Sequence, residues 1–509
     1  MIKMKFDEYP VDIVIEFVRE GRTIPFEENE EYIREIFLGE SVTDKHFFLQ
    51  NLLLFRLLDE IPISEIEKVM AMEIVDVKHF EFPAISVSNK QNDCVLRGKI
   101  VYTSKPPKRN SFLVDNNVIR ACKTFKSLFN TKNFILVFDG REFTGTSFML
   151  SVVVAHFFSQ KLFEYFMFTG EVLPSGKINK VDSILEKKKL AQRYGKKLIS
   201  PEDVSSIEEV DFWLNESKPL PVPFSVMIKK NNDGLKLLES AIKEREPLFS
   251  LKNLEVFFEI KREDISILHS GFLSENYQEW LAFVHRIREQ LRKLFSNEKL
   301  VELKKPVINL ICSESIISFV IGVLVGTKKR VVFHSYNRGD NVYVPSMETD
   351  DSLRSLDFPG AEFCGELIDY EYFISDKNKN VLPVIIDMAP TTRIEYDVKE
   401  FLKKNRIENF IVIKIDRDKI KNYIPEDTNI RKKLVKEIYN LLNCQTFKKF
   451  SKLWFFMNLP VDIAFGLGST FQDTRMISLF KFFPGKKDKY VEVLNVSPGP
   501  SPGGVKSIF

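Results

Sequence analysis

Two groups of side chains in the first half of the chain could do covalent chemistry together. Hydroxyls lie at Thr144 and Ser147, at the start of the apolar run FMLSVVVAHFF, and three lysines follow about forty residues later at Lys187, Lys188 and Lys189. A neutral lysine can take the proton of a hydroxyl, and the alkoxide that forms can attack a peptide carbonyl. The pattern therefore predicts a peptidase that uses a serine and a lysine.

The predicted base must be buried, because free lysine has a pKa of about 10.4 and is charged at neutral pH. Phe148, Val152 and Phe166 are apolar residues that could surround it. A purely structural interpretation also exists, since a hydroxyl before an apolar helix commonly caps that helix and a lysine run commonly faces water. We interpret His156, which is isolated in the sequence, as a packing or surface residue and not as a base.

Residues 138–201 resemble the proteolytic domain of Lon. The match runs through TGE at Thr169–Glu171, the turn PSGKI and the helix and strand of ILEKKKLAQRYGKKLISP. The chain departs from the family at the nucleophile, where a short glycine-proline-serine turn is replaced by the longer DGREFTGTSF. An ungapped alignment places Thr144 and Lys187 at the catalytic positions, and a short insertion would instead place Ser147 there.

The resemblance leaves open which hydroxyl is the nucleophile and which lysine is the base. Ser147 is the preferred nucleophile, because the family uses a primary hydroxyl and a β-branched threonine is more hindered; Thr144 is the alternative. Lys187 has the ungapped match and Lys188 pairs with the register shifted toward Ser147. Consecutive helical residues point about 100° apart, so only one of the lysines can face the hydroxyl.

The hydrophobic pattern predicts a multidomain α/β protein. We expect a helical module at residues 1–80, a mixed α/β protease domain at 81–215, a linker at 216–253 and a doubly wound domain at 254–509. The linker is predicted from the proline-bearing stretch NESKPLPVPFSV. In the last region, LEVFFEI and the later apolar runs are predicted strands of a largely parallel sheet, and residues 275–296 a long amphipathic helix.

An internal repeat lies within this last region. The stretch from Val307 to Tyr336 and the stretch from Lys452 to Phe483 share one plan: strand, polar turn, glycine-containing apolar helix and aromatic strand. Residues 307–326 are apolar enough to suggest a membrane span, but Glu314 near their centre favours a strand, a turn and a buried helix. Two copies of one unit predict a pseudo-symmetric domain with a ligand cleft between them.

Turns that follow parallel strands offer backbone N–H groups to phosphates. The two hydroxyls and the guanidinium of TTR suit a phosphate best, although the threonines could instead cap the following helix. Arg338 could reach the same cleft or sit in a hairpin turn. The predicted ligand-binding residues are Ser313, Arg338, Thr391, Thr392, Arg393, Asn458 and Leu459.

The paired units resemble the SAVED domain, a fused relative of the CARF sensors, and most of the chain resembles the SAVED-Lon proteases of type III CRISPR antiviral systems. That resemblance implies a cyclic oligoadenylate activator, specifically cyclic tetra-adenylate, and head-to-tail self-association. It also implies cleavage of an anti-sigma-like partner that holds a sigma-like factor. The alternative is an inactive Lon-like scaffold that acts as a ligand-gated binding protein.

Composition narrows the remaining function classes. The net charge is only +3, from 74 basic and 71 acidic residues, which argues against direct DNA binding. The five cysteines show no CxxC spacing, so we expect a reducing compartment and no metal. The charged N-terminus does not resemble an export signal. We therefore expect a cytoplasmic protein with no membrane partner and no cofactor besides the activating nucleotide.

Overall fold

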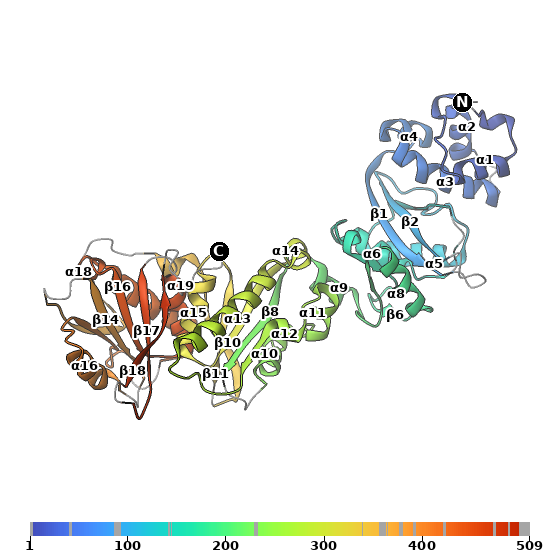
Figure 1. Ribbon diagram of the computed structural model, residues 1–509. Helices are drawn as coiled ribbons and strands as arrows, with labels where there is room; N and C mark the ends of the chain where they lie inside the picture. Colours follow the sequence, from blue (N-terminus) through green and yellow to red (C-terminus); the bar gives the residue numbers. More distant parts are fainter. Residues whose placement is uncertain are drawn as a thin grey trace. The chain divides into compact units, whose positions relative to one another are not determined.

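The computed structural model describes residues 4–39, 43–85, 93–140, 143, 145–228, 233–337, 339–355, 363, 365–375, 380–389, 393–420, 424–471, 475–486 and 489–497. The chain divides into two compact units, Met1–Lys218 and Pro219–Phe509 (Figure 1). No helix in the described ranges is long and apolar enough to cross a membrane.

The first unit begins with short helices that share a core with the sheet that follows them. Ile33, Leu53 and Val69 of the helices are fully buried and belong to one apolar cluster with Val101 and Val137 of the sheet. The helical segment is therefore part of the first unit and not a separate body. Its helices are η1 (Phe6–Glu8), α1 (Val11–Arg19), α2 (Phe26–Leu38), α3 (Asp44–Glu60) and α4 (Ile63–Met70).

An antiparallel sheet of three strands, in the order β1-β2-β3, follows the helices. Its first strand begins at Ile74, so the helices end earlier than the predicted boundary at residue 80. The run IVDVKHFEFPA is rich in β-branched and aromatic residues, which favour a strand. The strands are β1 (Ile74–Ala84), β2 (Cys94–Thr103) and β3 (Phe134–Phe138).

The rest of the first unit is the mixed α/β region that the sequence predicted. Two small sheets occur in it: β4 pairs with β7 in parallel, and β5 pairs with β6 in antiparallel fashion. The elements are α5 (Asn116–Leu128), α6 (Met149–Phe157), α7 (Leu162–Tyr165), β4 (Phe166–Phe168), β5 (Glu171–Val172), β6 (Ile178–Asn179), α8 (Ile184–Arg193), β7 (Lys197–Ile199) and α9 (Ile207–Leu214).

In place of the linker expected at residues 216–253, the structure has a strand and helices. Strand β8 (Pro219–Ile228) pairs with β10 along most of its length, although it carries prolines at 219, 221 and 223. Residues two apart in a strand direct their backbone nitrogens to the same edge, so all three prolines lack an N–H on one side. On that side β9 pairs only from Ser225 onward, and no ladder hydrogen bond is lost.

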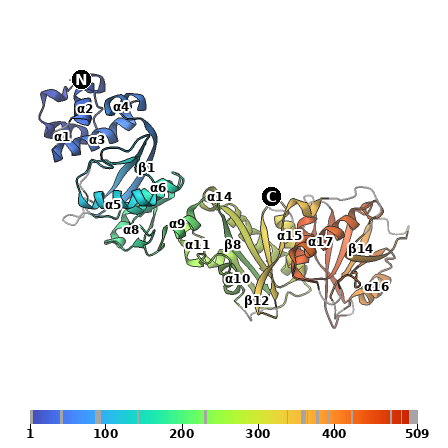
Figure 2. The same ribbon diagram turned by 180° about the vertical axis from the view of Figure 1, so that it is seen from behind.

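The second unit contains two mixed sheets with covering helices (Figures 1 and 2). The strand orders are β12-β11-β10-β8-β9 and β13-β15-β14-β16-β17-β18. The strands after β8 are β9 (Ser266–His269), β10 (Lys305–Cys312), β11 (Val331–Asn337), β12 (Val342–Glu348), β13 (Ile368–Phe373), β14 (Val381–Asp387), β15 (Phe410–Ile415), β16 (Lys452–Asn458), β17 (Met476–Phe482) and β18 (Tyr490–Val496).

One predicted strand of this unit is a helix. LEVFFEI lies mostly in α11, which begins after Ser250, whose hydroxyl accepts a hydrogen bond from the Asn253 N–H. A serine cap competes successfully with the strand propensity of the phenylalanines. The helices of this unit are α10 (Gly234–Lys243), α11 (Leu251–Phe258), α12 (Arg262–Ile265), α13 (Tyr277–Phe295), α14 (Glu298–Leu303), α15 (Ser315–Val325), η3 (Asp351–Arg354), α16 (Glu395–Lys404), α17 (Thr428–Asn443), α18 (Gln445–Lys448) and α19 (Val461–Thr470).

Both copies of the predicted repeat form the expected strand, helix and strand. The first is β10, α15 and β11, and the second is β16, α19 and β17. In each copy the central strand has parallel partners on both sides, and an antiparallel strand follows at the edge. We call these copies, with the strands that pair with them, the first and second halves of the second unit. The apolar run at 307–326 is thus β10 and α15.

Helices α15 and α19 join the two halves at a close crossing. A Cβ on Gly322 would lie 2.1 Å from the carbonyl oxygen of Phe465, and one on Gly468 would lie 1.8 Å from the carbonyl oxygen of Phe319. The Ser318 hydroxyl also donates to the Val461 carbonyl at 2.6 Å. The glycines are therefore required for the approach of the two backbones.

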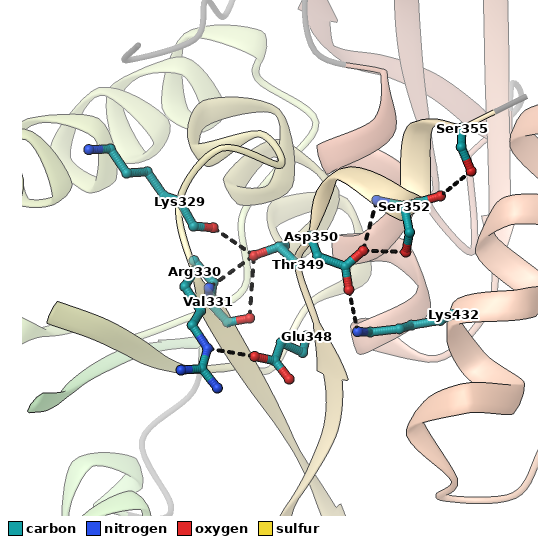
Figure 3. Close-up of polar contacts among 9 residues, drawn as sticks. All are labelled: Lys329, Arg330, Val331, Glu348, Thr349, Asp350, Ser352, Ser355 and Lys432. Carbon is teal, nitrogen blue, oxygen red and sulfur yellow. Dashed lines mark hydrogen bonds and ion pairs between the residues drawn. The ribbon is translucent and has the colours of Figure 1, made fainter. Parts of the chain in front are cut away.

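Polar contacts add to this joint. Arg431 of α17 forms an almost fully buried ion pair with Asp462 of α19 and donates to the Ser335 hydroxyl of β11 at 3.2 Å. The next residue, Lys432, binds Asp350 at 2.6 Å (Figure 3). Thr349 beside it accepts from the Val331 N–H at 2.9 Å. Helix α17 is thus fixed to the β11–β12 hairpin of the other half.

Candidate functional site

Ser147 lies just before α6, against the turn that carries the TGE motif. Its carbonyl oxygen accepts hydrogen bonds from the Gly170 N–H at 2.9 Å and from the Thr169 hydroxyl at 3.5 Å. The side chain of Ser147 is half-buried, and that of the following Phe148 is fully buried. These contacts fix the backbone of Ser147 beside a motif that lies 22 residues later in the chain.

Lys187 approaches the same motif from the first turn of α8. Its side chain is only 5% exposed, and its Nζ atom donates to the Thr169 hydroxyl at 3.2 Å. Burial lowers the pKa of Lys187 to about 8, and the carboxylate of Asp182 opposes part of this shift. A lysine with this pKa is neutral in a useful fraction of molecules near physiological pH.

The structure separates the three consecutive lysines by burial. Lys188 is partly exposed and forms a surface ion pair with Glu202 at 2.7 Å, and Lys189 is exposed. Lys187 alone among them reaches Thr169. Of the two lysines that the sequence analysis left open, Lys187 is therefore the one buried beside the TGE motif, and Lys188 lies at the surface.

Thr169 connects the lysine to the serine backbone. Its buried hydroxyl donates to the Ser147 carbonyl and accepts from Lys187, so one side chain positions both. Sequence reasoning used Thr169 only as part of a family motif and did not assign it a role. Phe148, Val152 and Phe166, the expected apolar residues, all have fully buried side chains.

The glutamate of the TGE motif is held from another direction. Glu171 forms an ion pair with Arg120 of α5 at 2.5 Å and accepts a hydrogen bond from Asn179 of β6 at 3.4 Å. The motif is therefore fixed on one side by α5 and β6 and on the other by α8.

His156, at the end of α6, stacks on Phe129 with ring centroids 3.7 Å apart, as a packing residue would.

In the second unit, two predicted ligand-binding turns lie at equivalent places in the two halves. The Ser313 hydroxyl accepts from the Ile228 N–H at 2.8 Å and so joins the carboxyl ends of β10 and β8. The Asn458 side chain donates to Asp387 at 2.8 Å and joins the ends of β16 and β14. Leu459, which follows Asn458, is buried. Both turns lie where the chain connections diverge, the usual place for a ligand in such sheets.

Arg393 lines a cavity of about 280 Å³ at the carboxyl ends of β14 and β15. The lining is mixed in charge: Lys414 and Arg417 contribute cations, and four aspartates, among them Asp387, contribute carboxyl groups. Asp387 also accepts from the Ile394 N–H at 3.0 Å, next to the start of α16. A phosphate here would meet carboxylates, so this turn is less suited to an anion than its sequence predicted.

Four predicted residues lie outside the described ranges. They are Thr144, the alternative nucleophile, and Arg338, Thr391 and Thr392 of the predicted ligand site. Within the residues that the structure does describe, no cluster of three or more His, Cys, Asp or Glu side chains could hold a metal ion.

The fold and sites define a two-unit α/β protein, with a buried lysine beside a hydroxyl-bearing turn in one unit and a duplicated strand-turn-helix in the other. No protein-family model and no curated protein matches the chain. Among solved structures it is similar to the Cap4 SAVED/CARF-domain containing receptor of Acinetobacter baumannii with the cyclic trinucleotide 2'3'3'-cAAA. The two share 11% identity over 54% of this chain and 51% of that one, with a TM-score of 0.32.

The Cap4 SAVED/CARF-domain containing receptor of Moraxella osloensis is similar over the same share of this chain. It is 14% identical, with 54% of this chain and 50% of the receptor covered and a TM-score of 0.30. The chain therefore spans about half the length of each of these receptors.

Proposed function

We propose that the protein is a Ser–Lys peptidase gated by a cyclic oligonucleotide, similar to the SAVED-Lon protease CalpL. The observation that carries the proposal is the buried Lys187, whose Nζ atom binds the hydroxyl that also holds the backbone of Ser147. Burying a lysine side chain costs stability, because its ammonium loses water, and such a cost is typical of a functional site. In this proposal the duplicated second unit is the sensor that binds the cyclic oligonucleotide.

The proposed reaction needs only groups of this chain and the substrate. Neutral Lys187 takes the proton of the Ser147 hydroxyl, and the alkoxide adds to the scissile carbonyl. Backbone N–H groups near Ser147 stabilise the oxyanion. The C–N bond then breaks as the Lys187 ammonium returns its proton to the leaving amine. Water hydrolyses the acyl ester and regenerates the serine.

The sequence resemblance extends the proposal to ligand and partners. It assigns cyclic tetra-adenylate as the activator, head-to-tail association of protomers as the step that follows binding, and an anti-sigma-like protein as the substrate. Such association is heterologous, because two different faces meet and the assembly can extend. The turns at Ser313 and Asn458 are the proposed contacts for the nucleotide.

Replacing Ser147 by alanine should abolish cleavage and leave nucleotide binding unchanged. The test incubates the full chain with cyclic tetra-adenylate and a protein encoded by a neighbouring gene, and identifies fragments by mass. Thr144→Ala is the matched control, because it removes the alternative hydroxyl from the same turn. If Ser147→Ala cleaves normally and Thr144→Ala does not, the nucleophile is Thr144. If the parent chain binds the nucleotide and cleaves nothing, the inactive scaffold is the better description.

Cleavage should also increase about tenfold between pH 7 and pH 9, because a base with a pKa near 8 goes from about one-tenth to about nine-tenths neutral over that range. Initial rates at saturating nucleotide and substrate measure the effect, with nucleotide binding checked at each pH. A rate that is flat across pH 8 would remove Lys187 from the role of general base.

A further inference from the structure

Each half of the second unit carries a β-hairpin whose antiparallel pairing continues further than the parallel ladder beside it. The ladder between β10 and β11 ends at Phe333, but β11 pairs with β12 as far as Asn337. In the second half, the ladder between β16 and β17 ends at Phe480, and β17 pairs with β18 as far as Phe482. Continuing these registers places Tyr336 level with Ser313 and Phe482 level with Asn458, so both hairpins reach the carboxyl ends of the neighbouring strands, where the predicted ligand-binding turns lie.

At this end each hairpin carries a cross-strand pair of aromatic rings. Tyr336 faces Tyr343 with ring centroids 5.3 Å apart at 58°, and Phe482 faces Tyr490 with centroids 5.4 Å apart at 56°. The first ring of each pair is 38% exposed in both halves. The same number of residues separates Tyr336 from Gly322 and Phe482 from Gly468, so the two rings are equivalent under the pseudo-symmetry.

The residue before each ring contacts the other half of the unit. Lys481 binds Glu314, in the turn after β10, at 2.7 Å. In the same way, Ser335 accepts from Arg431, which is paired with Asp462 at the start of α19. Each hairpin thus lies beside the strand-helix turn of the opposite half. Because side chains alternate along a strand, the two aromatic rings point to the other face and remain outside these polar contacts.

The rings are held in place by their surroundings. The Tyr336 hydroxyl donates to the Asn341 side chain, and Phe482 packs on Tyr490, which is only 4% exposed. A fixed and partly exposed aromatic ring offers a flat surface of the kind on which planar bases stack. Two such rings at equivalent positions match a ligand that presents more than one base.

We propose that Tyr336 and Phe482 are base-stacking residues, one in each half, that hold two nucleobases of the cyclic oligonucleotide. The inference rests on the proposed sensor function of this unit. Stacking uses the flat face that every base has, so these rings supply affinity and leave the choice of base to polar groups.

The test uses the full chain and cyclic tetra-adenylate in a calorimetric titration. Tyr336→Leu and Phe482→Leu should each weaken binding by about ten- to a hundredfold, the range for the loss of one stacked base. Tyr336→Phe and Phe482→Tyr keep a ring and should stay within about threefold of the parent chain. Tyr372→Leu is the matched control: it removes a 51% exposed ring from β13, at the opposite edge of the sheet from β18.

A second measurement needs no variant. Cyclic tetra-adenylate with one adenine replaced by 2-aminopurine should lose fluorescence on binding the parent chain, because stacking quenches that base. If the ligand binds without quenching, or if both leucine variants fold and bind like the parent, the assignment of Tyr336 and Phe482 as stacking residues is wrong, while the sensor function stands. If the parent chain binds none of the cyclic tri-, tetra- and hexa-adenylates, the sensor function and this inference both fail.

Discussion

Replacing Lys187 by methionine is expected to abolish peptide cleavage and, at the same time, to stabilise the first unit at pH 7 by about 3 kcal/mol. The gain follows from a folded pKa near 8 against 10.5 for an unperturbed lysine, at 1.36 kcal/mol per pKa unit. Methionine fills a similar volume and carries no charge into the buried site. Urea unfolding and a cleavage assay on the same preparation measure both effects.

The pH dependence of this stability gain has a definite sign. Below pH 8 the lysine is charged in the folded and the unfolded state, so the full cost of the buried charge is present. Between about pH 8 and 10.5 the folded lysine is neutral while the unfolded one is still charged, and the advantage of methionine falls toward zero. Lys188→Met is the control: its exposed pair with Glu202 should be worth less than about 1 kcal/mol, with cleavage retained. Equal stability effects for both variants would contradict a buried Lys187.

Replacing Gly468 by alanine should destabilise the second unit by about 3 kcal/mol or more, because overpacking that forces a backbone shift costs this much. The added Cβ would lie 1.8 Å from the carbonyl oxygen of Phe319, and that oxygen belongs to a helix backbone that cannot move alone. Thermal and urea unfolding of the full chain, followed by the transition of the second unit, measure the loss.

Two other glycines complete this experiment. Gly322→Ala places its Cβ 2.1 Å from the carbonyl oxygen of Phe465 and should have nearly the same effect, because the two sites are equivalent in the repeat. Gly271→Ala has no atom within 4 Å of its new Cβ and should change stability by less than about 0.5 kcal/mol. A small effect at Gly468 would mean that α15 and α19 do not cross as closely as described.

Elements with a clear local pattern could be predicted from the sequence. The repeat was visible because each copy keeps a continuous apolar strand, a glycine-containing helix and an aromatic strand, and these became β10, α15, β11 and β16, α19, β17. The long helix expected at residues 275–296 is α13, Tyr277–Phe295. These segments bury apolar residues, so their hydrophobic pattern can be recognised in the sequence without knowing which elements pack against them.

The errors occurred where tertiary context decides. Alternating prolines at 219, 221 and 223 suggested a linker, but β8 is a paired strand because its neighbour β9 is too short to need those N–H groups. The choice between Lys187 and Lys188 depends on which side of α8 is covered, and neighbouring residues of identical type carry no such information. Asp387 was missed because it contacts Asn458 and Ile394 across strands and a turn.

The crossing of α15 and α19 also bears on how the second unit originated. The eighth residue of each helix, Gly322 or Gly468, lies against the fifth residue of the other helix, Phe465 or Phe319. A symmetric dimer makes the same reciprocal contact at an isologous interface. A tandem duplication of a dimerising ancestor produces this contact within one chain. After fusion each copy is free to diverge, as the turns have done with Ser313 in one and Leu459 in the other. In the proposed sensor, a cyclic oligonucleotide with equivalent nucleotides would then contact two halves that present different side chains to it.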